Sequence, residues 1–485
     1  MEEEKGNIKS LLEAASKAAN LILECVRKGE KILIESHLDA DGIAAAGILG
    51  KALYRLESNL RIRIEKRFDE KVAEDIASEN PRLTVFTDMG SGYLDILSEK
   101  LPRKEIVILD HHQPLKEDAY ESFLQVNPHL HGIDGSRDLS GSGTSYLVAK
   151  KLDESNTDLA YLAVVGALGD LQDKYEQRSL GGVNRIIVED AVKSGYLEID
   201  TDLLFFGRET RPIHKALAYT TNPFIPDVSG EEDKALALLA GLDIPVKNME
   251  KWRALRDLSQ DEKKKLFSVL AGHLASKGLQ SDVAMNLIGT IYTLKREEPW
   301  TPLRDAREFA LLLNATGRTG KPSLGVSICM GGKGAILEQA DAVLDEYRQN
   351  IMKYLNLLNE NPDHIEELSN IYVLHGENLI DEKMLSAVST IISTNLPKPN
   401  KPVIAYSIVP DEGIVKISAR ANDLLTRSGL NLGEIVRIAA EKSSGKGGGH
   451  DIAAGGQVPY DRRKEFIRLV DELVKEKMER MKLGG

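Results

Sequence analysis

The sequence predicts an α/β protein built from a doubly wound parallel sheet, a largely helical insertion and a smaller second α/β unit. Three observations support this fold class. Apolar strand patterns alternate with helical patterns up to about residue 200, helical patterns dominate from there to about 300, and strand patterns return near 370. The length of 485 residues also exceeds what one compact core accommodates.

The first part of the chain has the rhythm of a parallel sheet. We expect strands at 31–37, 60–67, 83–89 and 105–112, and helices at 43–56, 140–152 and 157–170. The run LRIRIEKR alternates apolar and charged residues, as an edge or half-buried strand does. In such a sheet ligands bind beyond the carboxyl ends of the strands, so functional residues are expected directly after them.

The rest of the chain divides into an insertion, a connecting segment and a second α/β unit. The run LSQDEKKKLFSVLAGHL predicts one of several short helices that extend to about 298, and a long helix is expected at 335–360. A glycine-rich loop and a terminal amphipathic helix close the second unit. The predicted parts are 1–199, 200–300, 301–365 and 366–485, the third being a linker with the long helix.

Composition and charge narrow the class of function. The chain is 42% hydrophobic and 28% charged, as soluble globular proteins are. No apolar run reaches the roughly 18 residues of a membrane span, so we expect a cytoplasmic protein. A net charge of −12 argues against a surface that grips duplex nucleic acid everywhere, but it allows a local basic channel. Cys25 and Cys329 are expected to be buried free thiols.

A histidine and two aspartates follow the first predicted strand. In the run HLDADG, His37, Asp39 and Asp41 are alternate residues, so their side chains can converge. One imidazole and two carboxylates suit manganese, magnesium or iron better than a closed zinc site, which favours thiolates. An Asp-x-Asp-Gly run at a strand–helix junction is also typical of a simple capping turn, so this run alone leaves both interpretations open.

Acidic residues end three further predicted elements. Asp88 ends LTVFTDM, the triplet Asp110, His111 and His112 ends EIVILDHH, and Asp170 ends GALGD. A single aspartate can be a cap or turn residue, but three ionisable groups finishing an apolar strand are costly without a partner. Together these positions supply about the ligands of a dinuclear centre with a bridging carboxylate. The pattern predicts phosphoester hydrolysis without a covalent enzyme intermediate.

A glycine-rich run near the carboxyl terminus is a candidate phosphate site. Gly447, Gly448 and Gly449 are consecutive, and successive glycines let backbone N–H groups approach a phosphate. His450, which follows them, could donate a hydrogen bond, and Arg420 ends the predicted strand IVKISAR as a candidate phosphate clamp. A flexible turn and a surface salt bridge are the ordinary alternatives.

The motifs resemble those of a known superfamily. HLDADG, TDMG, LDHH and GALGD are similar, in this order, to motifs I to IV of the DHH phosphoesterases. GKGGGHDIAAGG is similar to the glycine–histidine motif of their DHHA1 partner domain. Over its whole length the chain resembles the archaeal RecJ-like nucleases, which include the GINS-associated nucleases of the Thermococcales. The resemblance implies a DHH domain, the insertion and a DHHA1 domain.

The resemblance also implies a division of labour between residues. It implies two manganese ions, for which magnesium or cobalt could substitute. One ion would be held by His37 and Asp39, the other by Asp41, His111 and Asp170, with Asp88 bridging them. Asp110 would orient His111, and His112 would contact the scissile phosphate. Arg420, Gly447, Gly448, Gly449 and His450 would hold nucleic-acid phosphates.

The activity implied is trimming of single-stranded nucleic acid. RecJ-like enzymes are exonucleases of replication and repair, usually 5′-to-3′ on single-stranded DNA, and archaeal relatives are also associated with RNA. The insertion resembles the part that docks the GINS complex at the replication fork. Two alternatives stay open: a phosphodiesterase for short oligonucleotides or small nucleotides, and a replisome scaffold that binds GINS. The complete ligand set argues against a scaffold alone.

Overall fold

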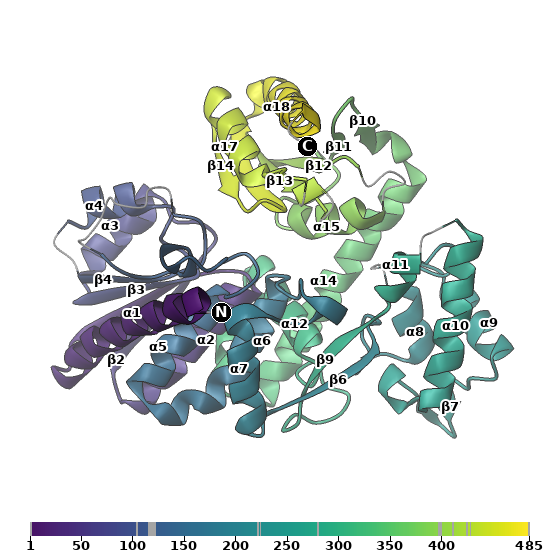
Figure 1. Ribbon diagram of the computed structural model, residues 1–485, viewed down its shortest axis with the longest axis horizontal. Coiled ribbons are helices and arrows are strands. Elements are labelled where there is room, and N and C mark those ends of the chain that lie inside the picture. Colours follow the sequence, from purple (N-terminus) through teal and green to yellow (C-terminus); the bar gives the residue numbers. More distant parts are fainter. Residues whose placement is uncertain are drawn as a thin grey trace. The chain divides into compact units, whose positions relative to one another are not determined.

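The computed structural model forms two compact units (Figure 1). The first consists of Met1–Thr220 and Ile225–Leu344, and the second of Thr221–Phe224 and Asp345–Gly485. The structure describes residues 2–102, 105–114, 123–220, 223, 225–278, 281–395, 400–409, 412–422, 425–426 and 428–483. Within these ranges no helix combines the length and apolar character needed to cross a membrane.

The first unit contains a five-stranded parallel sheet. Its strands are β1 (Lys31–His37), β2 (Asn59–Glu65), β3 (Leu83–Thr87), β4 (Glu105–Leu109) and β5 (Leu124–Val126). They lie in the order β2-β1-β3-β4-β5, with β2 at the edge as predicted, and all pairs are parallel. The predicted α/β class is confirmed. The direction of winding reverses between β1 and β3, which is where open parallel sheets bind their ligands.

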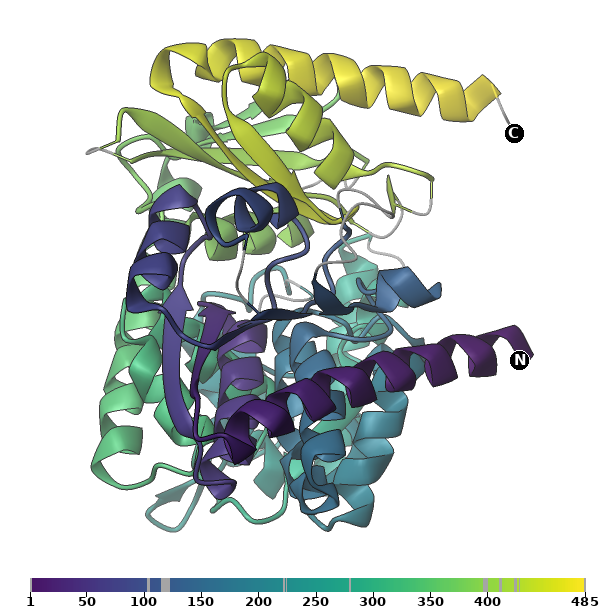
Figure 2. The same cartoon turned by 90° about the vertical axis from the view of Figure 1, so that its left-hand side faces the viewer.

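Helices cover both faces of this sheet, so β3 and most of β1 and β4 are buried and appear in the sequence as continuous apolar runs. The helices are α1 (Glu2–Arg27), α2 (Ala40–Arg55), α3 (Glu70–Glu79), α4 (Leu94–Lys100), α5 (Gly141–Leu152), α6 (Ala160–Gly169), α7 (Gly182–Lys193), α12 (Ala306–Arg318) and α13 (Pro322–Cys329). A hydrophobic cluster joins α3 and α4 to one face. On the other, α2 packs on β1, α5 on β3 and β4, and α1 on β5 (Figure 2). Behind them, α12 packs on α6 and α13 on α2.

The register aligns the carboxyl ends of the central strands. Ser36 of β1 pairs with Thr87 of β3, and Thr87 pairs with Leu109 of β4. The residues that come next in each strand direction, His37, Asp88 and Asp110, therefore lie at the same edge of the sheet.

The insertion has a hydrophobic core of its own. Its elements are β6 (Leu197–Leu203), α8 (Ile213–Ala218), α9 (Glu232–Gly241), β7 (Lys247–Asn248), β8 (Lys251–Trp252), α10 (Gln260–Ser276), α11 (Ser281–Met285) and β9 (Ile288–Leu294). The prediction of short helices up to about 298 was wrong for IGTIYTL, which forms β9. This run becomes a strand because it pairs with β6, far away in sequence. The predicted boundaries between parts stay predictions.

Buried charges connect the start of the insertion to the core of the first unit. Arg208, only 6% exposed, lies 2.9 Å from Asp202 and 3.8 Å from Asp305. The next residue, Glu209, donates its backbone N–H to Glu308 of α12 at 2.8 Å. Separating buried ions costs free energy, so these contacts hold the first residues of the insertion against α12 of the first unit.

The second unit is a mixed sheet with helices. Its elements are β10 (Ile365–Glu367), β11 (Tyr372–His375), α15 (Leu385–Asn395), β12 (Val403–Val409), β13 (Ile414–Arg420), α17 (Leu432–Lys442), β14 (Lys446–Gly449), β15 (Ala453–Pro459) and α18 (Arg463–Leu483), preceded by α14 (Ala335–Glu360), which contains the unit boundary. The strand order is β10-β11-β12-β13-β15-β14, and only β11 and β12 are parallel. One core cluster joins the sheet to α17 and α18.

The glycine-rich run corrects one prediction. It was expected to be a loop, but Lys446–Gly449 forms the edge strand β14, paired with β15. Close packing and backbone conformation favour glycine at Gly447 and Gly449, whereas a Cβ on Gly448 would meet no atom within 4 Å. A Cβ on Gly447 would lie 2.9 Å from a methyl carbon of Val436 on α17, and Gly449 adopts a φ of 141°.

Candidate metal centre

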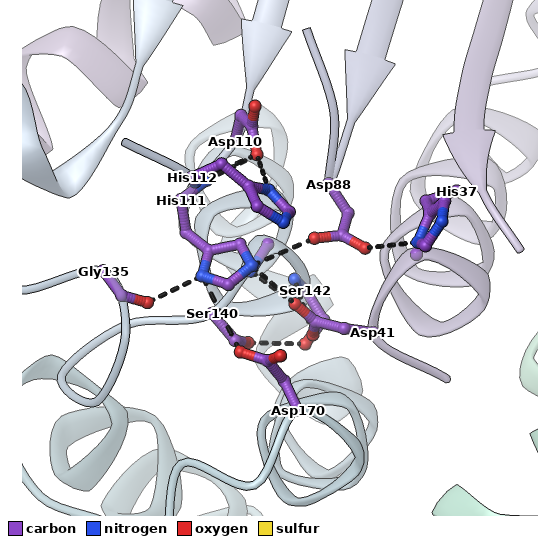
Figure 3. Close-up of polar contacts among 12 residues, drawn as sticks. His37, Asp41, Asp88, Asp110, His111, His112, Gly135, Ser140, Ser142 and Asp170 are labelled. Carbon is purple, nitrogen blue, oxygen red and sulfur yellow. Dashed lines mark hydrogen bonds and ion pairs between the residues drawn. The ribbon is translucent and has the colours of Figure 1, made fainter. Parts of the chain in front are cut away.

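Six predicted metal ligands converge at the carboxyl edge of the parallel sheet, beside the reversal between β1 and β3. Figure 3 labels all of them except Asp39. Their ligand atoms fall into two groups within 4.8 Å of one another: His37, Asp39 and Asp88; and Asp41, His111 and Asp170. A further group joins Asp88 to Asp110 and His112, which were not predicted as ligands. Asp88 belongs both to the group with His37 and to the group with His112, so its carboxylate lies between those two histidines.

The first group lies where β1 turns into α2. Asp39 caps α2 by accepting a hydrogen bond from the backbone N–H of Gly42 at 3.0 Å through Oδ1. Its other oxygen, Oδ2, lies 3.1 Å from Nδ1 of His37. The two interpretations of this run are therefore compatible, because one oxygen caps the helix and the other faces the site. A Cβ on Gly42 would lie 2.3 Å from the carbonyl oxygen of His37, so this tight turn needs glycine.

Asp41 is held by the amino terminus of another helix. It is 2% exposed, and its two oxygens accept backbone N–H groups of Gly141 at 2.6 Å and Ser142 at 3.1 Å, at the start of α5. The side chain of Ser140 caps that helix. The exposed N–H groups and dipole of a helix start favour a negative charge, so α5 fixes the Asp41 carboxylate.

Asp88 is the ligand that most needs a cation. It is 2% exposed, and neither carboxylate oxygen has a hydrogen-bond donor among the residues that the structure describes. Oδ1 lies 3.2 Å from Nε2 of His111, and Oδ2 lies 3.8 Å from Nδ1 of His37. Burial, together with the charges of Asp39 and Asp41, raises the pKa of Asp88 well above its usual range. A buried carboxylate without donors, between two imidazole nitrogens, fits a divalent cation with oxygen and nitrogen ligands.

His111 presents one defined ring nitrogen to the site. Its Nδ1 donates to the carbonyl oxygen of Gly135 at 2.6 Å, so in the neutral ring Nε2 carries the lone pair. Nε2 lies 3.8 Å from Oδ2 of Asp41. Burial lowers the pKa of His111, but the charges of Asp170 and Asp41 outweigh it, and the pKa lies above its ordinary value. The surroundings of this ring therefore favour a positive charge.

Asp110 and His112 form a second pair. Asp110, 1% exposed, accepts backbone N–H groups from Ser91, His111 and His112, and the ring Nδ1 of His112 at 2.8 Å. Asp110 therefore contacts His111 through its backbone N–H and holds the ring of His112 directly, while its expected role in orienting His111 stays a prediction. Burial lowers the pKa of His112, yet Asp110 raises it to about 9. The His112 side chain is 40% exposed, so it can meet a substrate.

Asp170 follows the last turn of α6, and its surroundings include residues that sequence reasoning missed. Its Oδ2 accepts a hydrogen bond from Nε2 of Gln172 at 2.9 Å. Gln172, Gly135 and Asn184 lie outside the recognised motifs. The only signal for Gln172 was its position two residues after Asp170.

The predicted phosphate-binding residues lie in the second unit, whereas all predicted metal ligands lie in the first. Arg420 ends β13, and its guanidinium donates to the hydroxyls of Thr390 at 2.8 Å and Ser386 at 2.6 Å on α15. Arg420 pairs with Ala453 on β15, and the backbone N–H of His450 donates to the Ala453 carbonyl at 2.8 Å. The structure thus brings Arg420 and His450 to one end of the mixed sheet.

Comparisons with known proteins identify the family. Models of the DHH-CID domain and the DHHA1 domain match residues 205–288 and 370–476. The chain is 33% identical over 454 residues to the uncharacterized protein MJ0831 of Methanocaldococcus jannaschii, covering 93% of this chain and 94% of that protein. It is 29% identical over 245 residues to the single-stranded-DNA-specific exonuclease RecJ of Thermus thermophilus, covering 47% of this chain and 35% of RecJ. The chain belongs to the RecJ-like DHH/DHHA1 proteins.

Two solved structures of other proteins are similar in fold to this chain. Thermus thermophilus RecJ in complex with Mn²⁺ matches with a TM-score of 0.56 and 18% identity, over 96% of this chain and 55% of that one. CDC45 from Entamoeba histolytica matches with a TM-score of 0.62 and 11% identity, over 95% of this chain and 99% of that one. At such identities the likeness concerns the fold.

Proposed function

We propose that this RecJ-like protein is a manganese-dependent exonuclease that hydrolyses single-stranded nucleic acid with two metal ions. The observation that carries the proposal is Asp88, a buried carboxylate without a hydrogen-bond donor in the described part of the chain. Its two oxygens face the imidazoles of His37 and His111. Similar proteins include RecJ, whose structures hold Mn²⁺ or Mg²⁺, so either ion, or cobalt, fits the proposal.

The ligands divide between two ions that share Asp88. In the proposal, His37 and Asp39 hold one ion, and Asp41, His111 and Asp170 hold the other. When bound, the ions would supply Lewis-acid activation of water and of the phosphoryl group. The protein's part is to fix the donors: α5 holds Asp41, the turn into α2 holds Asp39, and Gly135 sets the ring of His111.

His112 is the proposed contact for the scissile phosphate. Its ring is partly exposed, and Asp110 accepts from Nδ1 at 2.8 Å and so orients the imidazole. In the proposal, Nε2 donates to a phosphate oxygen. Asp110 receives four hydrogen bonds, so it is anchored and can align the ring without itself binding substrate. Donors placed where charge develops commonly contribute about 10²–10³-fold to a rate.

The second unit would supply phosphate contacts along the strand. We assign them to Arg420, His450 and the glycines Gly447, Gly448 and Gly449. The bonds from Arg420 to Ser386 and Thr390 pre-orient its guanidinium, which lowers the entropic cost of binding a phosphate. Single-stranded DNA cleaved 5′-to-3′ is the proposed main reaction, with RNA as a second substrate, and the insertion is the proposed docking site for GINS.

The experiment is digestion of end-labelled single strands of DNA and RNA with Mn²⁺, comparing wild type with Asp88→Asn. Loss of a ligand shared by both ions should lower the rate by well over about 100-fold, since changes to residues behind the ligands already cost about 10–100-fold. Asp190→Asn is the matched control, because Asp190 is a half-buried carboxylate on α7 bonded to Tyr146 and Lys150. Full activity of Asp88→Asn would overturn the two-metal proposal.

Two further outcomes separate the alternatives. Faster cleavage of a dinucleotide than of a long strand would favour a small-nucleotide phosphodiesterase. Binding of GINS without any Mn²⁺-dependent cleavage would favour a scaffold.

A further inference from the structure

We propose that Gln172 and Asn184 are positioning residues that fix the donor atoms of Asp170 and His111 for one of the two ions. This inference rests on the proposed metal centre. We call these hydrogen bonds, which run from Asn184 through Gln172 to the carbonyl of Gly135, the amide relay.

The relay begins on α7 and has only one chemically consistent orientation. Nδ2 of Asn184 donates to Oε1 of Gln172 at 2.7 Å. Nε2 of Gln172 then donates to the carbonyl oxygen of Gly135 and to Oδ2 of Asp170, both at 2.9 Å. If the Gln172 amide were reversed, its oxygen would face a carbonyl and a carboxylate, and its NH₂ would face the NH₂ of Asn184. The carbonyl and the carboxylate, which accept hydrogen bonds, thus orient the Gln172 donor, and Asn184 holds the opposite end of the amide.

The carbonyl oxygen of Gly135 connects Gln172 to His111, because it accepts a hydrogen bond from each of them. It accepts from Nδ1 of His111 at 2.6 Å as well as from Gln172, so it stays an acceptor for the ring. The proton of the neutral ring is therefore on Nδ1, and Nε2 is the nitrogen available to an ion. A Cβ on Gly135 would lie 2.1 Å from the carbonyl oxygen of His111, so only glycine lets this loop approach the ring so closely.

The Gln172 amide also makes the two carboxylate oxygens of Asp170 different, because it bonds to one of them. The bond from Gln172 occupies Oδ2, which leaves Oδ1 free of that contact and available to an ion. One amide thereby sets two ligands of the same ion, His111 and Asp170.

Burial and backbone geometry both favour a dedicated role for Gln172. Gln172 is 0% exposed and Asn184 is 2% exposed. Gln172 reaches the site because Leu171 turns the chain back after α6 with a φ of 56°, and the backbone N–H of Gln172 bonds to Ala167 at 3.0 Å. A left-handed conformation costs a residue such as leucine about 1–2 kcal/mol, and the Leu171 side chain is 54% exposed, so its own packing offsets little of that cost.

Two variants break the relay in different ways. Gln172→Met keeps the approximate volume and removes both donors. Asn184→Asp keeps the shape but replaces the donor with a carboxylate, which sets two acceptors against each other at Oε1 of Gln172 and so removes the bond that holds the amide from the α7 side. Asn156→Leu is the matched control. Asn156 is 1% exposed, and its amide bonds to Ala149 and Arg55.

The readout is Mn²⁺ binding, measured by titration calorimetry and by electron paramagnetic resonance of the bound ions. For both relay variants we expect one of two dissociation constants to rise by about 10–100-fold, the usual effect of losing a partner behind a ligand, while the other stays unchanged. In Gln172→Met/Asn184→Asp the loss should equal that of Gln172→Met alone, because both changes break one relay. The control should lose stability but keep both ions.

The outcomes separate this inference from the proposed function. If wild type binds two ions without cleaving any strand, the nuclease proposal fails, while weaker binding in the relay variants still supports the positioning role. If wild type cleaves and Gln172→Met binds both ions as tightly as wild type, the positioning role is overturned. Additive losses in the double variant would also overturn it, because they would indicate two independent structural effects.

Discussion

Without metal, the buried carboxylate of Asp88 should destabilise the protein, so Asp88→Asn should be more stable than wild type. Asp88 is 2% exposed, lacks donors in the described part of the chain and lies near Asp39 and Asp41. A carboxyl group can avoid a buried charge by binding a proton. Protonating an aspartate with an unfolded pKa of about 3.9 costs about 4 kcal/mol at pH 7. The buried Asp88 carboxyl can therefore lower the stability of the fold by no more than this amount.

We therefore expect Asp88→Asn to raise the free energy of unfolding of the metal-free protein by about 2–4 kcal/mol. Asparagine tolerates the left-handed φ of 56° at this position, so the substitution adds little backbone strain. At roughly 2 °C per kcal/mol for a large domain, Tm should rise by about 4–8 °C.

The assay is thermal unfolding followed by circular dichroism, with EDTA and with Mn²⁺. When the free Mn²⁺ concentration is 100 times its dissociation constant, binding of one ion adds about 2.7 kcal/mol to the free energy of unfolding of wild type. A variant that binds the ion weakly gains much less. The order of the two Tm values should therefore invert when Mn²⁺ is added. If Asp88→Asn melts below wild type in EDTA, the reasoning about an uncompensated carboxylate is refuted.

Three other substitutions test separate parts of the structure. His112→Gln should lower kcat by about 100-fold while Mn²⁺ affinity, measured by calorimetry, is unchanged; a loss of ions instead would make His112 a ligand. Gly141→Ala should abolish tight Mn²⁺ binding, because its Cβ would lie 2.6 Å from Oδ1 of Asp88, and normal binding would contradict the geometry. Hydrogen bonds from Arg253 lower the pKa of Glu262 to about 2 from an ordinary 4.5, so this carboxylate stabilises the fold above its ordinary pKa and less as the pH falls towards 2. Glu262→Gln should therefore cost about 1 kcal/mol at pH 7, and urea unfolding should show the difference shrinking below about pH 5; a constant difference would exclude a role for the charge.

Sequence patterns indicated which predicted metal ligands lie together, because parallel strands impose a common edge. His37, Asp88 and Asp110 each follow a strand, and strand register alone brings such residues together. The patterns could not show that Asp110 holds His112, since that contact depends on a turn of two residues and on side-chain rotamers. Gln172 escaped prediction because its role depends on α7 and on the loop at Gly135, neither of which is near it in sequence.

The two errors in the fold have different causes. The strand at Ile288–Leu294 is defined by its pairing with β6, and the strand at Lys446–Gly449 by its pairing with β15. The run IGTIYTL is rich in β-branched and aromatic residues, which favour a strand, and the helical prediction for the whole insertion overlooked this local preference. The glycines of β14 have little strand propensity, so in that segment long-range pairing outweighed local preference.

The pairing of β6 with β9 has a consequence for how this chain can change over evolutionary time. Leu203 lies opposite Ile288, so the DHH-CID segment begins and ends at neighbouring backbone positions. Residues can be added or lost between them at little entropic cost, because the ends of the segment are already joined by a strand pair. The charges around Arg208 hold the base of the segment in place. Changes of length on its far side therefore need not disturb the sheet edge at which the predicted metal ligands lie.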